Sequence, residues 1–159
     1  MIGGEQSGSL RATWFGARLP EDELARLEAH ARPASYEAGA EILREGELTR
    51  DLGVVVRGRV ALRLRVPERG LTTILTIEAG EVIGWSAVVP PHRSTSTVIA
   101  VVPTEVLLID GVQLRAELAA DPVLAAAVYR SLLEAVASRL TGTRMQLLDL
   151  FAQQHDEPW

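Results

Sequence analysis

The spacing of glycines between residues 36 and 110 constrains the fold of this chain more than any other feature. Seven glycines cut this stretch into short apolar runs: Gly39, Gly46, Gly53, Gly58, Gly70, Gly80 and Gly84. Short apolar runs separated by glycine turns are typical of an antiparallel all-β domain. We predict strands over 72–77, 98–102 and 105–109, and one long strand over 54–66 in which apolar residues alternate with arginines. A small barrel or sandwich is the economical packing for such strands.

Short helical patterns flank the β-rich stretch. Before it, apolar residues recur at helical spacing over 19–31, and Pro33 ends the pattern. After it, Asp110 followed by Gln113 predicts a capping box that starts a short helix through Leu118.

A long helix is predicted from Asp121 and Pro122, a cap and a first-turn proline, to about Gln154. It would be about 50 Å long at 1.5 Å per residue. Residues at steps of three and four form an apolar seam typical of a coiled coil: Ala126, Tyr129, Leu133, Val136, Leu140, Leu147 and Leu150. Thr143 lies on the same line.

A second apolar stripe runs along this helix through Val128, Leu132, Ala135 and Phe151. We expect this stripe to pack on the β domain. The seam then remains free for another chain, so the two stripes together predict a homodimer.

Composition and charge exclude several classes of protein. The chain has 159 residues, of which 47% are apolar and 23% charged, as expected for one globular domain. It has no cysteine, which excludes disulfide bonds, thiolate nucleophiles and cysteine-ligated zinc, and we expect it in the cytoplasm. All 16 basic residues are arginines, but the net charge of -5 opposes binding to a phosphate backbone. We expect no direct DNA binding.

Neither a membrane segment nor a catalytic motif is visible. The longest apolar runs, 98–102 and 106–109, are far shorter than the roughly 20 residues of a membrane span. His30, His92 and His155 are scattered, so we expect no metal site. The sequence has no Gly-x-Ser-x-Gly elbow and no P-loop, so we expect no enzymatic activity and no cofactor.

Five short motifs and the start of the long helix occur in a characteristic order. The motifs are YEAG at 36–39, ILREG at 42–46, VVVRGRV at 54–60, AGEVIG at 79–84 and TVIA at 97–100. Over about residues 15–151 this order resembles the cyclic-nucleotide-binding domain of the Crp/Fnr regulators, the family of the cyclic-AMP receptor. The resemblance implies an α+β fold, a cupin-like jelly-roll β-barrel with an N-terminal helix and a long C-terminal dimerisation helix.

The resemblance also implies a ligand site after Gly84. In the family, a short helical turn at this place presents backbone N–H groups to a cyclic phosphate, which here implies Gly84, Trp85, Ser86 and Ala87. A Glu that accepts the ribose hydroxyl is replaced by Trp85, which has no carboxylate. On the long helix, Thr143 matches the hydroxyl that contacts the purine.

The second charged group of the family site is also altered. Its phosphate-binding Arg matches Ser94, with Arg93 one position before it and Thr95 one position after it. The cluster that starts at Arg93 is either an anion site or an ordinary polar loop. Trp85 either fills the pocket, stacks on a planar ligand or packs under the loop, and Thr143 either contacts the ligand or is a polar seam residue.

We therefore expect a loose N-terminus over 1–11, a cyclic-nucleotide-binding-type barrel over 12–120, a dimerisation and lid helix over 121–154, and a tail over 155–159. The leading hypothesis is a dimeric, non-enzymatic sensor of a small anionic or planar ligand that binds cyclic nucleotides weakly or in a changed way. One alternative is a ligand-free module that binds a protein partner through the helix seam. Another is a Crp/Fnr-type transcription regulator acting through a partner, because no helix-turn-helix follows the helix.

Overall fold

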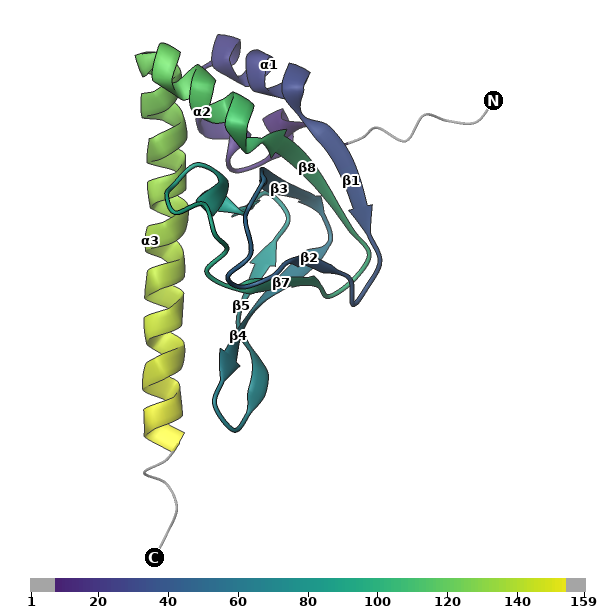
Figure 1. The fold of residues 1–159 in the computed structure, drawn as a ribbon, viewed down its shortest axis with the longest axis vertical. Helices are drawn as coiled ribbons and strands as arrows, with labels where there is room; N and C mark the ends of the chain where they lie inside the picture. Colours follow the sequence, from purple (N-terminus) through teal and green to yellow (C-terminus); the bar gives the residue numbers. More distant parts are fainter. Residues whose placement is uncertain (1–7, 154–159) are drawn as a thin grey trace, which may run out of the picture.

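The computed structural model describes residues 8–153 of the chain. Two four-stranded antiparallel sheets form a jelly-roll sandwich, with two helices at one end and a long helix along one side (Figure 1). In pairing order, the first sheet holds β1 (Arg32–Tyr36), β8 (Thr104–Asp110), β3 (Asp51–Arg57) and β6 (Val82–Ile83), and the second holds β2 (Glu41–Leu43), β7 (Thr97–Ala100), β4 (Arg59–Val66) and β5 (Gly70–Glu78). The predicted α+β jelly-roll with an N-terminal and a long C-terminal helix is confirmed.

Strand β3 is buried on both of its faces. Val54 belongs to the larger core cluster, beneath the helices, while its neighbour Val55 belongs to the smaller cluster between the sheets. Both side chains are fully buried. A strand covered on both sides has consecutive apolar residues, which explains why β3 reads Val-Val-Val.

The long strand predicted over 54–66 is wrong, because the chain turns at Gly58 and passes from β3 in one sheet to β4 in the other. Gly58 has a φ of 90°, in the left-handed region. A Cβ atom there would lie 2.6 Å from both the Pro103 carbonyl oxygen and the Thr104 Oγ1. The apolar alternation continues through this turn, so the sequence pattern concealed it.

Three α-helices lie within residues 8–153: α1 (Glu21–His30), α2 (Gly111–Ala120) and α3 (Pro122–Gln153). The predicted cap of α2 is present, since Asp110 Oδ1 accepts a hydrogen bond of 2.8 Å from the Gln113 N–H. Asp121 Oδ1 caps α3 by accepting hydrogen bonds from the N–H groups of Val123 (2.9 Å) and Leu124 (3.1 Å). Both caps satisfy donors that would otherwise lack a partner.

The buried side chains of helix α3 lie in its first half, and Arg139 of its second half contacts β6. Val128, Leu132 and Ala135 are buried, as predicted for the stripe that faces the domain. Phe151 does not belong to the buried stripe, because this side chain is 57% exposed. No helix in the described part of the chain has the length and hydropathy to cross a bilayer.

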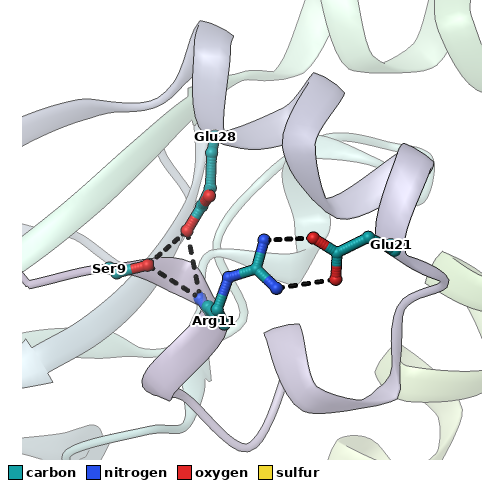
Figure 2. A network of polar contacts seen from close by, with 4 residues as sticks. All are labelled: Ser9, Arg11, Glu21 and Glu28. Atoms are coloured by element: carbon teal, nitrogen blue, oxygen red, sulfur yellow. Dashed lines mark hydrogen bonds and ion pairs between the residues drawn. The ribbon is translucent and has the colours of Figure 1, made fainter.

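The N-terminal segment is held by polar contacts to α1. Arg11 forms a bidentate ion pair with Glu21, with nitrogen-to-oxygen distances of 2.6 and 2.5 Å, and Ser9 donates a hydrogen bond to Glu28 (Figure 2). That hydrogen bond lowers the pKa of the Glu28 carboxyl. Leu10, in a 3-10 turn over Leu10–Ala12, is fully buried. Leu10 and Arg11 are therefore held in place, whereas residues 1–7 of the loose segment predicted over 1–11 lie outside the described residues, as does the predicted tail over 155–159.

The turn at Gly58 allows a test of the fold with a matched control. Gly39 also has a positive φ, of 88°, but no heavy atom lies within 4 Å of a Cβ placed there. We expect Gly39→Ala to cost about 1–2 kcal/mol of unfolding free energy, for backbone strain alone. We expect Gly58→Ala to cost about 2 kcal/mol more, because its Cβ also overlaps the 103–104 backbone. Chemical denaturation measures both, and equal losses would contradict this account of the β3–β4 turn.

Candidate functional site

A tight turn follows β6 and begins at Gly84. Gly84 has a φ of 68° and a ψ of 30°, and a Cβ atom there would lie 2.6 Å from the Asp51 carbonyl oxygen. Only glycine fits this position without displacing the backbone. The next three residues form a 3-10 turn, η3 (Trp85–Ala87), in which the Ala87 N–H donates to the Gly84 carbonyl at 2.9 Å. This is the short helical turn that the resemblance implies.

A cavity of about 370 Å³ lies between the sandwich and α3. Most of its wall is apolar, from Leu62, Leu64, Ile74, Leu75, Val136 and Leu140. The polar side chains of the wall are Thr95, Ser96, Arg139 and Thr143, and Trp85 completes it. Strands β4 and β5 thus form one side of the cavity, and one face of α3 forms the other.

A narrow recess adjoins this cavity and shares Leu62, Trp85, Thr95, Ser96 and Arg139 with it. The recess has a volume of about 10 Å³, and its lining is mixed: Gly84, Ser86 and Ser94 stand beside the aliphatic side chains of Leu43, Ile77, Ile83 and Val98. Such a volume holds about one water-sized group. The combined space is therefore amphipathic, because most of its polar side chains lie at the small end of mixed lining, whereas the large end is mostly apolar.

Arg139 is the cationic group of this space, and the sequence analysis missed it. Its Nη2 donates a hydrogen bond to the Val82 carbonyl of β6, while its Nε is buried and has no hydrogen-bond partner. Burial lowers the pKa of the Arg139 guanidinium, and the charge of Glu81 opposes that shift. No described carboxylate forms an ion pair with it. One signal could have found it, because Arg139 precedes Thr143 by four residues and so shares its helix face.

Most of the predicted pocket residues do lie together. Gly84, Trp85, Ser86, Ser94 and Thr95 line the recess, and Thr143 lines the cavity. The hydroxyl of Ser94 donates a hydrogen bond of 2.6 Å to the Ser96 carbonyl.

Two predicted pocket residues lie elsewhere. Arg93 is exposed, and its Nη1 donates a hydrogen bond of 2.9 Å to the Gly46 carbonyl, so its guanidinium lines neither space. The adjacent backbone forms a β-bridge with Leu48, which fixes this orientation. Ala87 is fully buried in the core beneath the turn and does not line the pocket.

Trp85 separates the cavity from the outer surface of α3. The indole borders the recess, the cavity and an external apolar groove of about 380 Å³ lined by Tyr129, Leu132, Leu133 and Val136. It is partly buried and packs against the larger core cluster. This placement favours the interpretation that Trp85 packs against α3 over the interpretation that it fills the pocket.

No acidic side chain lines the cavity or the recess. Among the described lining residues, none therefore offers a carboxylate to a sugar hydroxyl. Among residues 8–153, no three His, Asp or Glu side chains come together as a metal site.

This architecture agrees with a match to a known protein family. Residues 33–121 match the family model described as the cyclic nucleotide-binding domain. The match covers more than half of the chain, and the chain belongs to this family.

Solved structures with the same fold include cyclic nucleotide-binding and regulatory proteins. A protein of Geobacter metallireducens GS-15, described as a cyclic nucleotide-binding protein, is 26% identical with a TM-score of 0.74, over 88% of this chain and 99% of that chain. The N-terminal domain of a transcriptional regulator from Streptomyces coelicolor A3(2) is 27% identical with a TM-score of 0.65, over 87% and 94% of the two chains. A cyclic nucleotide-binding domain from Methylobacillus flagellatus KT is 22% identical with a TM-score of 0.75, over 82% and 74%, a likeness of fold. No curated protein matches the sequence.

Arg139 should contribute little to folding, because a buried guanidinium without an ion pair loses much of its hydration. We expect Arg139→Met to leave the free energy of unfolding unchanged or to raise it by about 1 kcal/mol, since the side chains have similar length and the loss of one hydrogen bond offsets part of the gain. Arg144→Met, an exposed change on the same helix, is the control. Denaturant titration measures both, and a loss of more than about 2 kcal/mol for Arg139→Met alone would make Arg139 a structural residue.

Proposed function

We propose that this chain is a dimeric, non-enzymatic sensor domain of the cyclic nucleotide-binding type, acting in the cytoplasm. The observation that carries the proposal is the composition of the cavity wall. Leu62, Leu64 and Leu75 come from the sandwich, whereas Val136, Arg139 and Leu140 come from α3. A ligand in this space contacts both bodies at once, so its binding energy favours one pose of α3 over others.

Cyclic nucleotides are expected to bind this site weakly. The lining has no carboxylate for the ribose hydroxyl, and Arg93 points to Gly46 instead of the cavity. Arg139 is the one guanidinium among the described lining residues, and it enters from α3. A hydrogen bond to a charged group contributes about 1.5–3 kcal/mol, so the missing carboxylate alone removes about one to two decades of affinity.

The homodimer is supported by an exposed apolar row on α3. Tyr129 is 47% exposed, Leu133 68%, Leu140 50% and Leu147 54%. Ala126 is exposed and Val136 half-buried on the same line, while the side chain of Leu150 lies outside the described residues. The groove beside Trp85 continues this row. Apolar surface of this extent typically marks an interaction site, and a second copy of α3 is a self-complementary partner for it.

A second candidate function is a ligand-free module that binds a protein partner through the same row. The observation that favours it is the packing of Trp85 against the core at the position where the family has its carboxylate. The similarity to the N-terminal domain of a transcriptional regulator favours a role in transcription through such a partner. Ligand titration separates these candidates from the sensor.

The dimer is tested by placing charge in the exposed row. We expect Leu133→Glu and Leu140→Glu each to give monomers in light scattering, because an unpaired carboxylate buried in an apolar interface costs several kcal/mol. Val112→Glu, at a position on α2 that is also 68% exposed, should remain dimeric. A wild-type monomer at high micromolar concentration would contradict the proposed assembly.

Restoring the missing carboxylate tests the nucleotide site. We expect Trp85→Glu to bind cyclic AMP about 10-fold more tightly than the wild type, because it supplies an acceptor for the ribose hydroxyl. Trp85→Gln removes the indole without adding a charge and should gain less. Calorimetric titration measures all three proteins, with folding checked by thermal melting. Equal gains for Glu and Gln would mean that removal of the indole, and not the carboxylate, opens the site.

A further inference from the structure

The amphipathic shape of the cavity indicates the chemical class of its ligand. We infer that the site binds a monocarboxylate with a compact hydrocarbon body, its carboxylate at Arg139 and its hydrocarbon in the apolar cavity. This inference rests on the proposed sensor function and names the ligand that the sensor detects.

The small end of the space suits one carboxylate. Arg139 forms no ion pair with a described carboxylate, with Glu81 acting on it only as a charge that it does not contact as an ion pair, and its Nε is buried without a hydrogen-bond partner. A buried, unpartnered donor on a cation is costly unless an anion pairs with it. The hydroxyls of Ser86 and Thr95 border the same recess and can donate further hydrogen bonds.

The size of the recess limits how much of an anion it can hold. About 10 Å³ admits roughly one water-sized group, such as a single carboxylate oxygen. The turn that begins at Gly84 closes this end of the space. The buried Ser86 and Ala87 hold that turn against the core.

The wide end of the space suits a hydrocarbon. Its wall is formed mainly by leucine, isoleucine and valine side chains from β4, β5 and α3, and no acidic residue is among them. A nucleoside placed there would bury sugar hydroxyls and base nitrogens against apolar walls, and unsatisfied buried polar groups are unfavourable. A hydrocarbon body gains from the same walls in proportion to the area that it buries.

The position of Arg139 also connects such a ligand to α3. Its guanidinium reaches from α3 to the Val82 carbonyl on β6, one residue before Ile83 and two before Gly84. A carboxylate paired with Arg139 therefore lies where the helix, β6 and the turn meet. Binding there stabilises the contact between α3 and the sandwich.

Calorimetric titration of the full chain with four probes tests this inference. The probes are sodium octanoate, 1-octanol, octylammonium chloride and cyclic AMP, of which the first three share one hydrocarbon chain and differ in charge. We expect octanoate to bind at least about 10-fold more tightly than 1-octanol, as a charge-assisted hydrogen bond predicts, and octylammonium to bind most weakly. Equal affinities for octanoate and 1-octanol would overturn the inference.

Variants on α3 test whether Arg139 is the residue whose charge binds the carboxylate of octanoate. Arg139→Gln should weaken octanoate binding about 10-fold or more and leave 1-octanol binding unchanged. Arg139→Lys keeps the charge and should lose less, while Arg144→Gln, at an exposed position of the same helix, should change neither. Unchanged octanoate binding by Arg139→Gln would overturn the inference.

Titration with cyclic AMP distinguishes a failure of the inferred ligand class from a failure of the proposed sensor function. If cyclic AMP binds and octanoate does not, the inferred ligand class is wrong and the sensor function stands. If neither binds to the folded dimer, both are wrong, and the ligand-free module takes their place.

Discussion

The packing of α3 against one side of the sandwich is the contact on which the rest of this structure depends. Val128, Leu132 and Ala135 bury the first half of the helix, and this contact places Arg139 and Thr143 over the cavity one and two turns later. Further along the helix, the side chains from 144 to 149 are exposed. One element thus forms core, cavity wall and exposed surface in succession.

In the function that we propose, this arrangement couples the cavity to the exposed row energetically. Val136 and Leu140 line the cavity and also belong to the row that we propose as the dimer seam. A ligand that favours one pose of α3 changes how these side chains meet a second chain, and by linkage the second chain changes ligand affinity. The domain needs no catalytic group for this role, since differential binding to two poses suffices.

Local signals in the sequence predicted much of the fold, whereas the directions in which side chains point could not be predicted from the sequence. The caps at Asp110 and Asp121 follow from the hydrogen-bonding chemistry of adjacent residues. The turn at Gly58 was missed because the apolar alternation runs through it, and Phe151 was misplaced because its stripe is buried only as far as Ala135. Arg93 is next to the pocket in sequence but turns to Gly46, and the cation of the site, Arg139, comes from a distant helix.

Hydrogen exchange along α3 tests the central claim most directly, namely that a ligand in the cavity changes the state of this helix. Exchange of the amides of residues 136–147 is measured for the wild type and for Arg139→Gln, each with octanoate, with cyclic AMP and without ligand. The account predicts slower exchange in this segment when octanoate is bound to the wild type, and a smaller change in Arg139→Gln at the same concentration. Unchanged exchange of the wild-type segment at a saturating concentration of ligand would contradict it.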